Sequence, residues 1–362
     1  MNAAELKAAW AGKRVLLTGH TGFKGAWLTL WLERLGAHVT GFSLAPEPDS
    51  LFLSAGVAKS CVHIEGDVRD VRAVKAAMKE CRPDAVLHLA AQSLVRRSYS
   101  EPLLTVETNV MGTANVLDAV RTAGHPCAVV VVSSDKCYEN RETFHGYRES
   151  DPMGGHDPYS MSKGATELVA SSWRRSFFPT SQLSQHGVAV ASARAGNVIG
   201  GGDWAADRIV PDCIRALRSG QPIAVRNPAS VRPWQHVLEP LSGYLVLGAK
   251  LMGPHAKDYC EGWNFGPWLD SSRPVSALAD EIVKAWGSGR WEDRGDPNAP
   301  HEASLLRLAI DQAHARLGWA PRWRFEETIR RTVAWYRAQV DGASADALRR
   351  LTLEQIADYE AA

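Results

Sequence analysis

The sequence lacks the features that place a chain in a membrane or on nucleic acid. Among its 362 residues no run of 18 is apolar, so we expect no membrane span. Residues 1–13 carry charges but no long apolar core, which argues against a signal peptide. The formal net charge is only +1, so no overall field favours nucleic acid or an anionic surface. Any anionic ligand must therefore be held by local groups.

Cysteine is also sparse and unpatterned. The six cysteines form no CxxC pair and lie with no histidine at metal-ligand spacing. We therefore expect reduced thiols in a cytoplasmic protein, with no metal site. The sequence contains no internal repeat and no low-complexity run, which leaves an ordinary globular protein of one or two domains.

What the sequence does contain is an alternation of strand and helix patterns. The short apolar runs typical of buried strands occupy residues 14–18, 38–42, 62–65, 85–89, 128–132 and 188–193. The helical patterns between them occupy about 24–35, 71–80, 103–123 and 158–178. This alternation predicts an α/β protein with a Rossmann-type doubly wound parallel sheet.

The composition changes at about Gly196, where Gly, Pro, Trp and Arg become frequent and the segments shorten. This change predicts a smaller C-terminal lobe that binds the substrate. We assign residues 1–196, with about 237–262, to a dinucleotide-binding domain. Residues 197–236 and 263–340 form the expected lobe, and residues 341–362 a C-terminal helix or tail.

A glycine-rich turn joins the first strand to the first helix, in the segment TGHTGFKG at 18–25. Gly19 permits a tight turn, Gly22 lets the backbone approach a diphosphate, and Gly25 allows the helix to pack closely on the strand. The N-terminus of the helix adds free N–H groups and a positive dipole end. These features predict a dinucleotide site. No acidic or basic residue stands directly after the second strand, so the residues leave NAD and NADP open.

Three residues combine into a catalytic pattern. Tyr159 and Lys163 form a YxxxK motif on one face of a predicted helix, and Ser134 follows the fifth strand. An ammonium group near a phenol favours the phenolate and lowers the pKa of the tyrosine, which could then act as a base. Ligands of such sheets bind at the carboxyl ends of the strands, where Ser134 is expected.

These segments resemble the extended short-chain dehydrogenase/reductase family. The resemblance covers about residues 10–340 and is carried by TGHTGFKG, LAAQ (89–92), the helix with Asn109, SSDKCYEN (133–140), DPYSMSKG (157–164) and RAGNVIGGGDW (194–204). It implies NAD as the cofactor. The residues it implies for NAD binding are Gly19, Thr21, Gly22, Phe23, Lys24, Gly25, Asp67, Val68, Leu89, Ala90, Ala91, Asn109, Ser133, Tyr159 and Lys163.

The pair Asp135-Lys136 and the segment RPWQHVLEPLSGYL (232–245) resemble the members of this family that dehydrate CDP-glucose at C4–C6. The resemblance implies that Tyr159 takes the 4-hydroxyl proton while hydride passes from C4 to NAD and later returns to C6. It implies that Ser134 hydrogen-bonds the ketone and that Asp135 protonates the leaving 6-hydroxyl. Lys136 would be the base at C5, or an electrostatic support for the enolate.

The substrate would be held by polar and aromatic side chains, because the net charge offers no general attraction to a diphosphate. The residues expected to bind it are Gln92, Arg194, Asn197, Trp204, Arg208, Arg226, Arg232 and His236. Two long helices at 103–123 and 158–178 carry apolar residues at helical spacing. In this family such helices pack between subunits, which implies a homodimer or homotetramer.

Three alternatives remain open at the level of the sequence. An NAD-dependent sugar-nucleotide 4-epimerase would share the glycine turn and YxxxK, but would need no acid–base pair such as Asp135-Lys136. A 4,6-dehydratase for another sugar nucleotide would differ only in recognition of the base. A catalytically silent dinucleotide sensor would keep the glycine turn and need none of Ser134, Tyr159 and Lys163.

Overall fold

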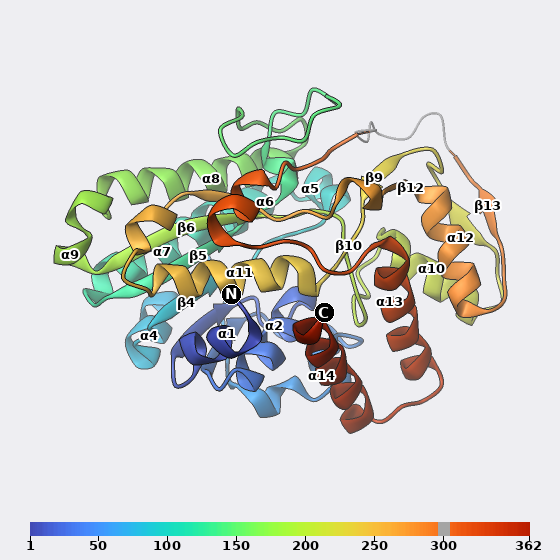
Figure 1. The fold of residues 1–362 in the computed structure, drawn as a ribbon, viewed down its shortest axis with the longest axis horizontal. Helices are drawn as coiled ribbons and strands as arrows, with labels where there is room; N and C mark the ends of the chain where they lie inside the picture. Colours follow the sequence, from blue (N-terminus) through green and yellow to red (C-terminus); the bar gives the residue numbers. More distant parts are fainter. Residues whose placement is uncertain (296–304) are drawn as a thin grey trace.

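A seven-stranded parallel sheet forms the centre of the computed structural model, which describes residues 1–295 and 305–362 (Figure 1). Its order is β11-β6-β5-β4-β1-β2-β3. The strands are β1 Arg14–Thr18, β2 His38–Ser43, β3 Val62–Glu65, β4 Ala85–His88, β5 Cys127–Val132, β6 Val188–Arg194 and β11 Gly262–Asn264. The predicted α/β fold and its six strands are confirmed, and β11 is an additional strand that the pattern did not predict.

The central strands are apolar on both sides because helices cover both faces of the sheet. Every residue of β5 and β6 is buried, as parallel sheets require. Side chains alternate along β1: Val15 and Leu17 belong to the core on one face, and Leu16 to the core on the other. The order of the strands reverses between β1 and β4, which leaves a crevice at their carboxyl ends.

The helices fall into two layers. One face of the sheet packs against α4 (Val71–Cys81), α7 (Gly112–Ala123) and α8 (Pro158–Ser176), and the other against α2 (Phe23–Arg34) and α11 (Leu238–Leu251). Asp157 caps α8 by accepting a hydrogen bond from Ser160 N, and Pro158 occupies its first position. The remaining helices of this part are α1 Ala3–Trp10, α3 Leu51–Ser54, α5 Val95–Ser100, α6 Pro102–Val106 and α9 Leu183–His186.

The helix predicted at 103–123 is divided. It consists of α6, a π-helical turn at Glu107–Met111 and α7. The π turn contains Asn109, which is buried next to the catalytic helix α8. Such turns are frequent at functional sites because the extra residue re-aims side chains.

The C-terminal half adds three two-stranded sheets beside the crevice (Figure 1). Their strands are β7 Val198–Ile199, β8 Ile223–Val225, β9 Val231–Pro233, β10 Gln235–His236, β12 Ser272–Pro274 and β13 Trp291–Asp293. The helices here are α10 Ile209–Arg218, α12 Val275–Trp286, α13 Phe325–Val340 and α14 Ala345–Ala361. The expected division into domain, lobe and tail stays a prediction, and its residues 296–304 lie outside the described part of the chain.

Candidate active site

The glycine turn between β1 and α2 has the shape of a phosphate cradle. Gly19 has φ +76°, and a Cβ there would lie 2.7 Å from Ala90 N. A Cβ on Gly25 would lie 2.1 Å from Gly19 O, so only glycine permits this approach of helix to strand. Gly22 is exposed and begins α2 without a side-chain cap. Its backbone therefore faces open space at a helix N-terminus, which fits a dinucleotide diphosphate.

The other residues expected around this cradle lie close to it. The Thr21 hydroxyl is 2.8 Å from Ser43 Oγ, at the end of β2. Phe23 and Lys24 are the first two residues of α2 and are half-buried. Burial and the charge of Lys163 lower the pKa of Lys24 to about 7. Three residues directly after β4 are half-buried beside the turn: Leu89, Ala90 and Ala91.

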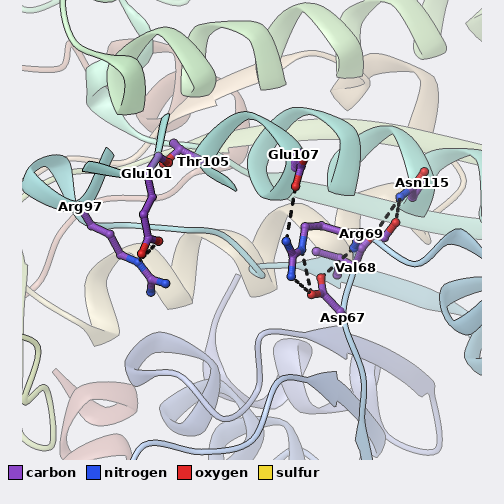
Figure 2. A network of polar contacts seen from close by, with 8 residues as sticks. All are labelled: Asp67, Val68, Arg69, Arg97, Glu101, Thr105, Glu107 and Asn115. Carbon is purple, nitrogen blue, oxygen red and sulfur yellow. Dashed lines mark hydrogen bonds and ion pairs between the residues drawn. The ribbon is translucent and has the colours of Figure 1, made fainter. Parts of the chain in front are cut away.

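The turn after β3 carries Asp67 and Val68, and its shape is fixed by its neighbours (Figure 2). Arg69 Nε donates to Asp67 Oδ2 at 2.8 Å, and this guanidinium lowers the pKa of Asp67. Asn115 Nδ2 donates to Val68 O at 2.9 Å, while Arg69 reaches Glu107 at 3.4 Å. Asp67 is therefore an ionised acceptor in a fixed position, which suits the amino group of an adenine.

The side chains predicted to be catalytic lie together at the carboxyl end of β5. Ser134 caps the 3₁₀ turn Asp135–Cys137, and its hydroxyl lies close enough to Tyr159 of α8 to lower the pKa of the phenol by hydrogen bonding. Tyr159 and Lys163 are buried one turn apart on that helix, at 8% and 4% exposure. Tyr159 N donates to Ser98 Oγ at 3.1 Å, which ties the start of α8 to α5. The sequence pattern and the geometry thus agree in bringing these three residues together.

The electrostatics of this group differ from the sequence expectation. Burial raises the pKa of Tyr159 to about 12 and lowers the pKa of Lys163 to about 8. The groups that lower the pKa of Tyr159 are Ser134 and Arg208 rather than the expected Lys163, and desolvation outweighs them, with Asp135 adding to the opposing effect. A phenolate at this position needs further positive charge in the crevice near neutral pH.

Asp135 and Lys136 follow Ser134 directly. Asp135 is 3% exposed, and its Oδ1 accepts a hydrogen bond from Ser134 at 2.9 Å. Its Oδ2 is buried and has no hydrogen-bond partner in the described part of the chain. Lys136 is half-buried, and its backbone N–H donates to Ser134 Oγ at 3.3 Å. An orphaned carboxylate oxygen beside a catalytic hydroxyl suits a group that exchanges a proton with a ligand.

Two residues of the expected substrate set lie beside the catalytic group. Arg208 forms an ion pair with Asp203 at 2.7 Å, donates to Ser93 Oγ at 3.0 Å, and lowers the pKa of Tyr159 by its charge. Asn197 follows β6 with a left-handed φ of +50°. That conformation is uncommon outside glycine and marks a local turn of the chain after β6.

Two further arginines of this set have local partners. Arg226 is exposed and pairs with Asp207 at 2.9 Å. Arg232 is half-buried, and one of its guanidinium nitrogens donates to Val231 O at 3.0 Å.

Four residues expected to bind substrate have partners inside the protein, and their role in substrate binding stays a prediction. Arg194 pairs with Glu167 at 2.8 Å and donates to Tyr138 Oη at 2.7 Å, so its guanidinium is occupied. His236 is fully buried between the rings of Trp27 and Trp323, and burial lowers its pKa to about 3.

Gln92 and Trp204 are the other two. The side chain of Gln92 forms hydrogen bonds to Leu94 in its own loop and to Thr105. Trp204 donates to Gln339 at 3.1 Å and packs edge-on against Tyr336. Asn109 and Ser133 of the NAD set are likewise bonded inside the protein, to Ser162 at 2.8 Å and to Glu167.

The sequence analysis missed two residues of the site. Tyr244 of α11 lies 3.4 Å from Lys24 Nζ, and burial and the charges of Tyr159 and Asp135 raise its pKa. No local pattern marks this position, because α11 is buried on nearly every side. Glu167 lies one turn after Lys163, and its spacing from the YxxxK motif could have drawn attention to it.

Other classes of site find no support in the described residues. No group of three or more His, Cys, Asp or Glu side chains there could hold a metal ion. Within the same residues, no helix combines the length and apolarity of a membrane span. All six cysteines are free thiols.

A family model and a relative of known name both match most of this chain. The model of the family described as GDP-mannose 4,6 dehydratase matches residues 16–332. The chain is 49% identical over 358 residues to a CDP-glucose 4,6-dehydratase of Salmonella typhimurium, with 98% of each chain covered.

Two solved structures are similar in both sequence and fold. A dTDP-glucose 4,6-dehydratase from Streptomyces venezuelae, solved with NAD, is 25% identical with a TM-score of 0.74, over 90% of this chain and 97% of that one. A UDP-glucose 4-epimerase from Thermus thermophilus, also with NAD, is 26% identical with a TM-score of 0.76, over 91% and 99%.

Proposed function

Because this chain belongs to the GDP-mannose 4,6 dehydratase family, we propose that it converts CDP-D-glucose to CDP-4-keto-6-deoxy-D-glucose, with NAD as its cofactor. The observation that carries the proposal is the cluster of Ser134, Asp135 and Tyr159 at the carboxyl end of β5. The hydroxyl groups of Ser134 and Tyr159 would serve the oxidation at C4. The separate carboxyl group of Asp135 would serve the loss of water at C6. The relative named for this reaction, which is similar along its whole length, supports the choice of substrate.

The residues present fit NAD. The cradle of Gly19, Gly22 and Gly25 would hold its diphosphate at the N-terminus of α2, and Asp67 would accept from its adenine. When bound, NAD supplies the acceptor and then the donor of the hydride that moves from C4 to C6. Since the hydride returns within one turnover, the reaction has no net redox change. Because no acidic residue directly follows β2, the adenosine ribose would be recognised by groups such as Thr21 and Ser43.

The proton transfers fall to the chain's own side chains. Tyr159 accepts the proton of the 4-hydroxyl, and Ser134 donates a hydrogen bond to the oxygen as it becomes a ketone. The ketone acidifies C5, whose proton Lys136 takes or whose enolate it stabilises, and a proton returns to C5 when hydride is delivered to C6. Asp135, with its unpartnered Oδ2, protonates the leaving 6-hydroxyl. Arg208, Asn197, Arg226 and Arg232 remain the proposed contacts to the sugar nucleotide.

We infer a cytoplasmic homodimer or homotetramer. Large apolar side chains are exposed on the helices that cover the α8 face of the sheet: Leu103 at 76%, Leu168 at 61% and Met111 at 53%. Exposed apolar side chains gathered on neighbouring helices are typical of an interface between subunits.

Incubation with CDP-glucose and added NAD tests the proposal. A 4-keto-6-deoxy product absorbs strongly in alkali, and mass spectrometry would show the loss of one water. A product of unchanged mass with inverted C4 would instead establish a 4-epimerase. Parallel incubations with dTDP-, GDP- and UDP-glucose measure base preference, and turnover only with one of these would overturn the choice of CDP-glucose.

A further inference from the structure

The helix α8 carries a buried carboxylate, Glu167, after Lys163. Glu167 is 4% exposed and stands one helical turn after Lys163 and two turns after Tyr159 on α8. Its Oε1 accepts a hydrogen bond from Ser133 Oγ, and its Oε2 accepts from Ser192 Oγ at 2.6 Å. Both serines belong to the strand ends that form the floor of the site. Glu167 therefore fastens the catalytic helix to β5 and β6.

The same carboxylate is paired with Arg194. The guanidinium lies 2.8 Å from Glu167 Oε2, and its other nitrogen donates to Tyr138 Oη at 2.7 Å. Tyr138 in turn donates to Asn264 Oδ1 in β11, at 2.7 Å. These contacts therefore connect α8, through Arg194 of β6, to Tyr138 in the segment after Asp135-Lys136. Arg194 and these hydrogen bonds lower the pKa of Glu167, so the carboxylate is ionised despite its burial.

Glu167 is the group whose charge most favours an ammonium at Lys163. The titratable neighbours of Lys163 are Glu167 and Tyr159 on its own helix, Cys137 on the 3₁₀ turn, His88 on β4 and Lys24 on α2. Cys137 stays a thiol and His88 stays neutral, because burial disfavours the charged form of each. The positive charge of Lys24 disfavours a second cation at Lys163. Burial alone would push Lys163 toward the neutral amine, and Glu167 acts against this.

We propose that Glu167 is a positioning residue of the reaction: its carboxylate keeps Lys163 as an ammonium and holds Ser133, and through it Ser134, against Tyr159. The inference rests on the proposed function and extends it by one residue. Glu167 does not touch the reacting atoms. Its effect reaches them through the charge of Lys163 and through the position of the strand end that carries Ser134.

The test is the variant Glu167→Gln, which keeps the shape of the side chain and removes its charge. Lys163 is followed by competitive labelling with a small amine-reactive anhydride across a pH series, read by peptide mass spectrometry. We expect the pH of half-maximal labelling of Lys163 to fall by about one unit, as for loss of a nearby opposite charge. Turnover of CDP-glucose should fall about tenfold at neutral pH and more steeply at alkaline pH, where Lys163 loses its proton.

Two further variants separate this role from a purely structural one. Glu167→Gln alone leaves the buried charge of Arg194 without an ionic partner, so the protein will be less stable. The double variant Glu167→Gln/Arg194→Gln removes both charges, and should regain stability toward urea while keeping the lowered labelling pH. Glu239→Gln, which changes a buried carboxylate of α11 outside this network, should lose stability and leave the labelling pH of Lys163 unchanged.

The outcomes decide the proposal. It is overturned if Lys163 is labelled with the same pH dependence in Glu167→Gln as in the unchanged protein. It is equally overturned if turnover falls by one constant factor at every pH, which would indicate a structural role only. If the unchanged protein fails to turn over CDP-glucose, the proposed function fails, and the labelling series still measures whether Glu167 controls Lys163.

Discussion

Ser134 at the end of β5 lies beside Tyr159 of α8, close enough for its hydroxyl to lower the pKa of the phenol by hydrogen bonding. This contact brings the expected base and the expected hydrogen-bond donor to a single oxygen of a bound sugar. It depends on the parallel order of β5 and β6, because α8 is the crossover that connects them.

Replacement of Tyr159 by phenylalanine should remove the base and leave the fold intact. The ring is 8% exposed and its packing does not need the hydroxyl. General bases contribute roughly 10²- to 10⁴-fold to rate, so turnover of CDP-glucose should fall by about that factor. The measurement is initial rate with saturating NAD, with the urea unfolding midpoint as the control. Near-normal turnover by Tyr159→Phe would show that another group takes the proton.

The strands could be predicted because their apolar runs are continuous, and the catalytic group because YxxxK and Ser134 stand at fixed places relative to those strands. β11 escaped prediction since it has only three residues, Gly262–Asn264, and its pairing with β6 is visible only in space. The partner of Arg194 escaped prediction for a related reason. The sequence shows its charge, but not that Glu167 on a neighbouring helix neutralises it inside the protein.

Gly196 should be intolerant of a side chain because of Asp135. A Cβ at this position would lie 1.9 Å from Asp135 Oδ2, so Gly196→Ala must displace the carboxyl group from Ser134. A displacement of about 1 Å in such a site can cost about 100-fold in rate. We expect this loss in turnover, with NAD binding retained.

Gly266→Ala is the matched control for this substitution. Its Cβ would make only ordinary contacts, the nearest at 3.4 Å from Leu308 Cβ, and Gly266 has no positive φ. Turnover of this variant should stay close to that of the unchanged protein. Equal losses in the two alanine variants would show that Asp135 is not the reason for the glycine at 196.

The exposed apolar side chains on α6 and α8 should hold subunits together. Leu103 and Leu168 are 76% and 61% exposed, which is a large apolar surface for water to cover. Leu103→Glu and Leu168→Glu place charges on this surface and should convert the oligomer to a monomer, measured by light scattering during gel filtration. Leu269→Glu, at a 69% exposed position far along the chain, is the control. A monomer before any substitution would refute the proposed interface.

Glu239 should make stability fall as pH rises toward neutrality. Its carboxyl group is buried in α11, accepts from Tyr359 Oη at 2.5 Å and Trp323 N at 2.7 Å, and has its pKa raised to about 7 by burial. The unfolded chain releases this proton near its ordinary value of 4.5, so between the two values the folded state binds more protons. The free energy of unfolding therefore decreases through that window, by roughly 2–3 kcal/mol from this group.

The comparison with Glu239→Gln isolates this contribution. Buried His20, His88 and His236 have lowered pKa values, and they act in the opposite sense, since the unfolded chain binds their protons first. Those histidines are the same in both proteins, so the difference between the two urea-unfolding curves from pH 4.5 to 8 reports Glu239 alone. The free energy of unfolding should decrease more with pH in the unchanged protein than in Glu239→Gln. Parallel pH dependences would show that the carboxyl group is already ionised in the folded protein at about pH 5, held so by its hydrogen-bond donors.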